Sequence, residues 1–178
     1  MAEVIPAILE KEFPPIQDKL SKVENLVDWV QIDIADGELV DNKTFLDPTP
    51  FKDLDTSLNF ELHMMVKDPL RYLERYAQAG FMRFFAHVEG DFVEEFINKC
   101  YQLGVEAGLA IDGPTKLDKI KPYLDNLDCV LVMAIKSGFS GQPYREDTTE
   151  KIAQIRKIDL TLPIAVDGAM NLDNAKKV

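Results

Sequence analysis

Residues 30–37 have the sequence VQIDIADG, in which apolar and polar residues alternate before an Asp-Gly turn. The alternation predicts a β-strand, because successive side chains of a strand point to opposite faces of a sheet. The apolar face would pack against covering helices. Gln31 and Asp33 would share the other face near the carboxyl end of this strand, and the turn at Asp36-Gly37 would follow.

Similar apolar runs recur on both sides of this strand. Seven segments are expected to be strands: residues 4–9, 29–34, 60–66, 83–88, 107–111, 129–135 and 162–166. Helix start signals lie between several of them, at Asp68-Pro69, Asp91 with Glu94, Thr115 with Asp118, and Asp147 with Glu150. Gly80 and Gly104 are the expected helix ends.

Strands that alternate with helices at about 25-residue spacing need parallel pairing and crossover connections. A doubly wound sheet and a (β/α) barrel both satisfy this requirement. We favour an α/β fold of the TIM-barrel type, because most strands are followed by one helix and polar residues gather at strand carboxyl ends. Residues 1–178 are expected to form a single domain of about seven βα units. A further helix would begin in residues 171–178, and the eighth strand and helix would be missing.

The composition excludes several classes of protein. Of the 178 residues, 46% are hydrophobic and 29% are charged, which is typical of a globular protein and not of a disordered chain. A net charge of −11 disfavours nucleic acid and anionic membrane surfaces as partners. The longest apolar run, residues 129–135, is too short to span a bilayer. Cys100 and Cys129 are expected to be reduced core residues of a cytoplasmic protein.

The same alternation brings further titratable groups to the inner face of the strands. His63 in the third strand and Asp167 in the seventh should point inward, like Gln31 and Asp33. Two facing carboxylates either share a proton or hold a cation between them, and both states suit acid–base chemistry. Each residue could instead be an isolated polar group at a strand end. With two histidines in the chain, a three-histidine zinc site is excluded, so any metal also needs oxygen ligands.

These residues lie in ordered motifs that resemble the ribulose-phosphate 3-epimerase family over essentially the whole chain. The matching segments are Pro6-Ala7-Ile8-Leu9, Ile32-Asp33-Ile34-Ala35-Asp36-Gly37, His63-Met64-Met65-Val66, Ala86-His87-Val88-Glu89, Val132-Met133-Ala134-Ile135 with Gly138-Phe139-Ser140-Gly141-Gln142, and Val166-Asp167-Gly168. One such motif alone would be weak evidence. Six motifs in order, at the spacing of barrel units, make the resemblance specific.

The resemblance implies an isomerase that moves a proton at carbon 3 of a pentulose 5-phosphate. Asp33 and Asp167 would be the two catalytic acid–base groups. Gln31, Asp33, His63 and Asp167 would hold a divalent metal (Mn, Fe(II), Mg or Zn) that stabilises the enediolate oxygens. Residues 137–142 would form a mobile lid. The residues expected to bind the phosphorylated sugar are Ala7, Met65, Met133, Gly138, Phe139, Ser140, Gly141, Gly168 and Ala169.

Several positions depart from the family pattern, among them Lys136-Ser137 before the lid glycine. Gln31 replaces a metal-binding histidine, which favours Mn, Mg or Fe(II) over zinc and predicts a weakly held or absent metal. Ala7 replaces a serine, and Ala169 replaces a glycine. Without an eighth unit, half of the usual phosphate site on the last two loops would be absent.

Two other functions stay open. The chain could be a non-catalytic barrel remnant that self-associates or only binds a small phosphorylated ligand. It could also be a decarboxylase of the orotidine-phosphate type, although residues 33–36 lack the lysine of the motif in that family. The apolar first and last strands would leave an open barrel edge, which predicts a homodimer through that edge. His87 and Glu89 are expected to be a hydrogen-bonded polar pair lining the barrel.

Overall fold

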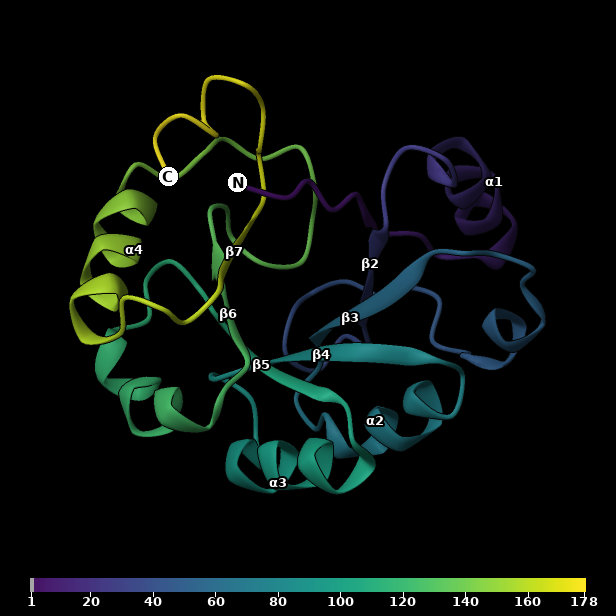
Figure 1. Ribbon diagram of the computed structural model, residues 1–178, viewed down its shortest axis with the longest axis horizontal. Coiled ribbons are helices and arrows are strands. Elements are labelled where there is room, and N and C mark those ends of the chain that lie inside the picture. Colours follow the sequence, from purple (N-terminus) through teal and green to yellow (C-terminus); the bar gives the residue numbers. More distant parts are fainter. Residues whose placement is uncertain (1) are drawn as a thin grey trace.

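Seven parallel strands curl around a common axis with the helices outside them in the computed structural model, which describes residues 2–178 (Figure 1). Each strand pairs with the next one in the sequence. The strands are β1 (Ala7–Ile8), β2 (Trp29–Ala35), β3 (Asn59–Met65), β4 (Phe81–His87), β5 (Glu106–Ile111), β6 (Cys129–Met133) and β7 (Ile164–Asp167). This arrangement confirms the prediction of an incomplete TIM-type (β/α) barrel.

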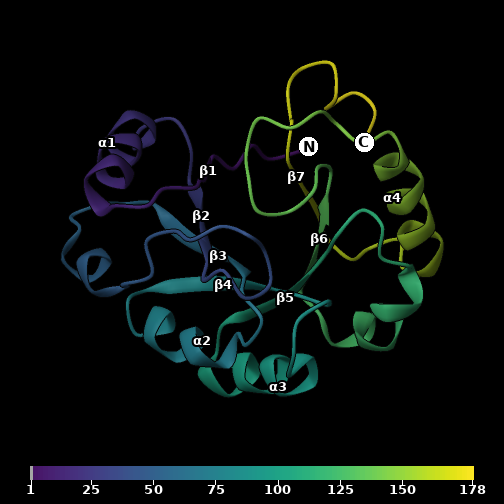
Figure 2. The ribbon, with the colours of Figure 1, turned by 180° about the vertical axis from the view of Figure 1, so that it is seen from behind.

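The helices connect consecutive strands and cover the outer face of the sheet, as the view from behind in Figure 2 also shows. The α-helices are α1 (Phe13–Val23), α2 (Leu70–Ala77), α3 (Val93–Leu103) and α4 (Asp147–Ile158), and the shorter 3-10 helices are η1 (Thr49–Asp53), η2 (Leu117–Lys119) and η3 (Lys121–Asn126). None of these helices is long and apolar enough to cross a membrane.

Apolar side chains fill both faces of the sheet. Ile32 and Leu62 from the strands pack with Leu73 and Phe96 from the helices in the large outer cluster. A smaller inner cluster consists of Phe85, Ala110, Cys129, Leu131, Met133 and Ile135. The strands are therefore covered on both sides, as parallel strands of α/β folds generally are. Both cysteines are free and buried, as expected.

The sheet is open between its first and last strands, because β1 and β7 do not pair with each other within residues 2–178. β1 is shorter than the predicted 4–9: Ala7 and Ile8 alone are in register with β2. Pro6 precedes them and has no N–H to donate, although its carbonyl accepts a 2.9 Å hydrogen bond from the Gln31 N–H. The unpaired edges agree with the expectation from the sequence.

One predicted helix is wrong, and one predicted helix cap is wrong. After Thr115 the chain forms η2 and η3 where an α-helix is expected. Pro122 explains this, because proline lacks the N–H that an α-helix needs and its ring clashes with a carbonyl of the preceding turn. Asp91 does not cap α3. Its N–H bonds to the Lys67 carbonyl, and Phe92, with a φ of 57°, precedes the helix instead.

The remaining helix signals have mixed outcomes. The Asp68 carboxylate accepts the Leu70 N–H at the start of α2, and Gly104 ends α3 in the left-handed conformation, both as expected. The helix predicted for residues 171–178 is wrong, because these residues form turns around the Asn171 side chain. The prediction also omits α1, although its first turn carries Pro14 and Pro15, a common helix start signal.

Candidate active site

Three titratable side chains meet at the carboxyl ends of the strands: Asp33 from β2, His63 from β3 and Asp167 from β7. Nδ1 of His63 lies 3.0 Å from Oδ1 of Asp33 and 3.4 Å from Oδ2 of Asp167. His63 is fully buried and Asp33 is 9% exposed. The structure thus brings together the three residues whose inward direction follows from strand alternation.

Gln31 joins this cluster through its amide nitrogen. Nε2 donates one hydrogen bond to Oδ1 of Asp33 at 2.8 Å and another to Oδ2 of Asp167 at 2.9 Å. The two N–H groups of one neutral amide therefore bridge the two carboxylates. For Gln31 to act as the expected metal ligand, its amide would have to turn so that the oxygen replaces the nitrogen.

His87, the last residue of β4, extends the cluster on the other side of His63. The Nε2 atoms of the two histidines are 2.9 Å apart, and Nδ1 of His87 is 3.2 Å from Oε2 of Glu89. The expected polar pair of His87 and Glu89 is confirmed. The contact of His87 with His63 is not predicted from the sequence, because His87 lies two residues beyond Phe85, the residue of β4 that is in register with His63.

Burial and hydrogen bonding act in opposite directions on the charged groups. Burial raises the pKa of Asp33 above its usual range, which hydrogen bonds from His63 and Gln31 oppose. Burial would also raise the pKa of Asp167, but the hydrogen bond and charge of His63 lower it below its usual range. Burial alone would lower the pKa of His63. Its hydrogen bonds to Asp167 and Asp33 outweigh this effect and raise that pKa to about 10.

The donor atoms of the cluster fit a divalent cation. One nitrogen of His63 and one oxygen each of Asp33 and Asp167 all lie within 4.8 Å of one another. An imidazole and two carboxylates suit Mn(II), Fe(II) or Zn(II). These three residues could therefore hold one metal ion, with the Gln31 amide beside them.

The predicted sugar-binding residues on the strands differ in exposure. Met65 and Met133 end β3 and β6 and are each 3% exposed. Met133 is in register with Asp167, which places both on the same face of the sheet. Ala7 is in register with Gln31 and is exposed at the open edge.

The predicted lid, residues 137–142, is folded against the loop after β2. The Asn42 side chain donates a 2.6 Å hydrogen bond to the Gly138 carbonyl, and Gln142 donates to the carbonyls of Lys136 and Phe139. Phe139 is about half exposed, and Ser140 and Gly141 are also exposed. With the hydrogen bond from Ser137 Oγ to Asp112 Oδ1 at 3.3 Å, four side-chain hydrogen bonds hold this loop in its present position.

Gly168 and Ala169 follow Asp167 directly and place backbone N–H groups next to the cluster. Gly168 has a φ of 103°, and a Cβ there would clash with the Ile135 side chain, so no other residue fits. Ala169 has a φ of 53°, a left-handed conformation that costs an L-residue about 1 kcal/mol. The Asn174 side chain supports it through a 2.7 Å hydrogen bond to the Ala169 carbonyl.

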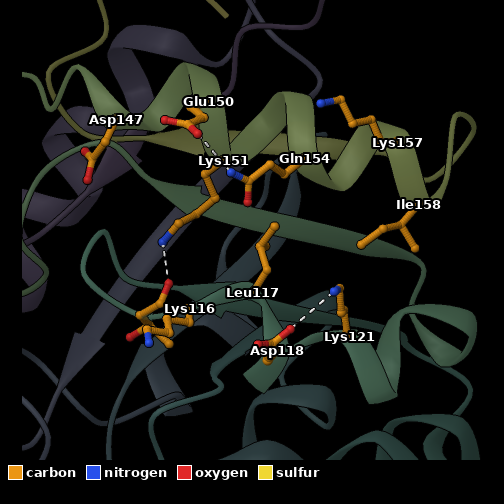
Figure 3. A pocket seen from close by; sticks show the side chains of 11 residues that line it. Lys116, Leu117, Asp118, Lys121, Asp147, Glu150, Lys151, Gln154, Lys157 and Ile158 are labelled. Carbon is orange, nitrogen blue, oxygen red and sulfur yellow. Dashed lines mark hydrogen bonds and ion pairs between the residues drawn. The ribbon is translucent and has the colours of Figure 1, made fainter.

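A separate groove lies between η2 and α4, on the outer side of the barrel (Figure 3). Lys151 reaches across it from α4 and donates hydrogen bonds of 2.7 to 2.8 Å to the carbonyls of Asp112, Gly113 and Thr115. The same loop contacts the cluster side of the barrel, because the Asp112 N–H donates to Glu89. Lys151 is therefore a link between α4 and the loop that supports Glu89.

Comparison with known proteins gives consistent results. A model of the ribulose-phosphate 3 epimerase family matches residues 3–178. The ribulose-phosphate 3-epimerase of Schizosaccharomyces pombe is 30% identical over 178 residues, which cover 96% of this chain and 78% of that protein. The enzyme of the same name from Rhodobacter capsulatus is 32% identical over 176 residues, which cover 95% of this chain and 76% of that protein.

A solved structure confirms the fold independently. The crystal structure of 3-keto-L-gulonate-6-phosphate decarboxylase from Vibrio cholerae superposes with a TM-score of 0.74, covering 98% of this chain and 81% of that one. At 12% identity, this likeness concerns the fold alone. The family model and the two relatives carry the assignment: this chain belongs to the ribulose-phosphate 3-epimerase family.

Proposed function

We propose that this chain is a ribulose-phosphate 3-epimerase, with Asp33 and Asp167 as its two acid–base groups. Inverting carbon 3 of a pentulose 5-phosphate requires removal of a proton beside a carbonyl from one face and return of a proton to the other. The observation that carries the proposal is the meeting of these two carboxylates, from β2 and β7, around the single nitrogen Nδ1 of His63.

The neighbouring side chains orient both carboxylates and help exclude water from them. His63 and Gln31 each contact an oxygen of both aspartates, which holds the carboxylates in fixed orientations. Met65 and Met133 contribute buried apolar surface next to the polar cluster and help exclude water. A divalent cation held by Asp33, His63 and Asp167 would stabilise the negative charge that develops on the substrate oxygens.

The phosphate group needs donors on the side of β7. We propose that it binds backbone N–H groups at Gly168 and Ala169, because the positive φ values there bend the backbone into a tight turn beside Asp167. Gly138 and Gly141 of the lid also have positive φ values and could bring further N–H groups to the ligand. Lys43 and Lys136, both exposed, are the candidate positive charges.

Deuterium incorporation tests the proposal directly. The chain is incubated with ribulose 5-phosphate in D2O, and the signal of the proton on carbon 3 is followed by NMR with and without added Mn(II). We expect deuterium at carbon 3 together with formation of xylulose 5-phosphate, and faster exchange with Mn(II). Unphosphorylated ribulose is the control for phosphate recognition. No exchange under either condition would contradict the proposal.

One observation favours a second candidate, a non-catalytic protein that only binds a small phosphorylated ligand. The amide of Gln31 already bridges the two carboxylates, so the cluster is satisfied without a cation. Titration calorimetry with ribulose 5-phosphate separates the two functions: binding without deuterium exchange would support the second candidate and exclude the first.

We also propose that the open side of the barrel is covered by a second copy of the chain. Unpaired backbone N–H and C=O groups at sheet edges favour association with another chain. Near β1, Val4 is 76% exposed, which adds apolar surface to that side. Sedimentation at micromolar concentration should show twice the chain mass of 20.2 kDa, and a clean monomer would refute the dimer.

A further inference from the structure

His87 and Glu89 lie outside the cluster formed by Gln31, Asp33, His63 and Asp167, and the proposed proton transfer does not use them. They are nevertheless joined to it by an unbroken row of polar contacts. Oε2 of Glu89 lies 3.2 Å from Nδ1 of His87, and the Nε2 atoms of His87 and His63 are 2.9 Å apart. Nδ1 of His63 lies 3.0 Å from Oδ1 of Asp33. Both histidines are almost completely buried, so water does not compete for these contacts.

The direction of these hydrogen bonds is set at the Glu89 end. Oε1 of Glu89 accepts the backbone N–H of Asp112 at 3.0 Å. A carboxyl group that accepts a backbone N–H is favoured in its ionised form, in which it can only accept. The contact with His87 is therefore a hydrogen bond donated by Nδ1–H of His87.

The proton on Nδ1 of His87 determines which nitrogen donates the hydrogen bond between His87 and His63. Once Nδ1 of a neutral His87 carries the proton, its Nε2 has a lone pair and can only accept. The ring centroids of His63 and His87 are 5.1 Å apart, with the ring planes 25° apart. Because the two Nε2 atoms are only 2.9 Å apart, the rings meet edge to edge through these nitrogens, with room for one proton between them. That proton comes from Nε2 of His63.

We propose that Glu89 and His87 are positioning residues that hold the proton of His63 on Nε2 and so present its Nδ1 to a divalent cation. This inference rests on the metal site proposed above. Metal-binding histidines generally donate their other ring N–H to a carboxylate or carbonyl, which fixes the ring and its tautomer. Here the acceptor is a second histidine, which a carboxylate orients in turn. The opposite tautomer would place the proton on Nδ1, between Asp33 and Asp167, and exclude a cation from that atom.

Metal affinity of two variants at position 87 tests the proposal. In His87→Leu, the Nε2–H of His63 loses its acceptor, whereas in His87→Gln a side-chain oxygen can replace it. By titration calorimetry with Mn(II), we expect His87→Leu to bind on the order of 10- to 100-fold more weakly, and His87→Gln to keep most of the affinity. Equal affinity of His87→Leu and the wild-type chain would overturn the proposal.

Histidine NMR tests it without a variant. The chain has two histidines, so nitrogen–proton correlation spectra of their rings contain few signals, and the spectrum of His87→Gln assigns them. In the wild-type chain, without metal and with Zn(II), we expect His87 to carry its proton on Nδ1 and not on Nε2. A proton on Nε2 of His87 would overturn the proposal even if His87→Leu failed to fold.

The two measurements also separate this proposal from the proposed function. If the wild-type chain binds no Mn(II), the metal site is wrong, but the tautomer of His87 in the metal-free chain still decides whether Glu89 and His87 orient His63. In Glu89→Gln, an amide can present either an acceptor or a donor to Nδ1, so we expect His87 to lose its single tautomer. A single unchanged tautomer in this variant would show that Glu89 does not set it.

Discussion

The amide nitrogen of Gln31 donates a 2.9 Å hydrogen bond to Asp167, although 136 residues separate them in the chain. Gln31 belongs to β2, which pairs with the edge strand β1, and Asp167 belongs to β7, the edge strand at the other end of the sheet. The other N–H of the same amide goes to Asp33, so a neutral group occupies the position between two carboxylates that a cation would otherwise take.

This relationship predicts that Gln31→His increases metal affinity. An imidazole offers a lone pair to Mn(II) or Fe(II), whereas the amide of Gln31 offers its donor end to the carboxylates. We expect the Kd for Mn(II) to fall by roughly tenfold or more, equivalent to about 1.4 kcal/mol. Gln154→His, on the exposed side of α4, is the matched control and should leave the Kd for Mn(II) unchanged. The same Kd for Gln31→His and the control would argue against a metal site here.

The two aspartates should be individually essential for exchange at carbon 3. Asp33→Asn and Asp167→Asn keep the size of each side chain but remove its ability to take a proton. We expect each to slow deuterium incorporation on the order of 10²- to 10⁴-fold, the usual contribution of a general acid or base. Asp125→Asn, an exposed residue in η3, should exchange at the wild-type rate. Retained activity in either active-site variant would refute the two-base assignment.

Much of the site could be predicted from the sequence, because it depends on one geometric rule. A strand alternates its faces, so the inward direction of Asp33, His63 and Asp167 follows once their strands are identified. The contact between His63 and His87 could not be predicted in this way. His63 is in register with Phe85, so His87 reaches it from two residues further along β4. That offset depends on strand stagger, which alternation does not determine.

The fold, like the site, could be predicted from the sequence only in part. The order and parallel pairing of the strands follow from the repeating strand and helix pattern. The connection after β5 differs from the prediction, because the proline at position 122 acts within a segment that otherwise has a helix start signal. Likewise, the amide orientation of Gln31 follows from the positions of both carboxylates and not from its own sequence neighbourhood.

Glu89 should make stability depend on pH in the acid range. Burial would raise the pKa of Glu89, but hydrogen bonds from His87, Thr115 and Asp112 lower it to about 2, from an ordinary value of 4.5. Because the folded-state pKa is lowered, the stabilisation is fully present above the unfolded value and is lost as pH falls toward 2. It amounts to at most about 3 kcal/mol.

Urea unfolding between pH 7 and pH 3 measures this contribution. We expect Glu89→Gln to be less stable than the wild-type chain at pH 7 and the difference to shrink as pH falls. Glu95→Gln, which changes an exposed carboxylate in α3, is the control and should show no such convergence. A constant difference between Glu89→Gln and the wild-type chain at all pH values would contradict the assigned role of the Glu89 carboxylate.

Lys151 should contribute more to stability than other lysines of α4. Its side chain is nearly buried, and its ammonium group donates to three carbonyls of the loop that supports Glu89. In Lys151→Met these carbonyls lose a charged donor within a partly closed groove. We expect the free energy of unfolding to fall by about 2 to 4 kcal/mol, because hydrogen bonds to charged groups are stronger than neutral ones.

Lys157→Met provides the matched control, since Lys157 lines the same groove but is exposed (Figure 3). It should change the stability by no more than about 0.5 kcal/mol. Urea unfolding at pH 7 compares both variants with the wild-type chain. Because the Asp112 N–H also bonds to Glu89, Lys151→Met should in addition weaken the pH dependence that Glu89 confers. Equal stability of the two methionine variants would show that the three carbonyls do not depend on Lys151.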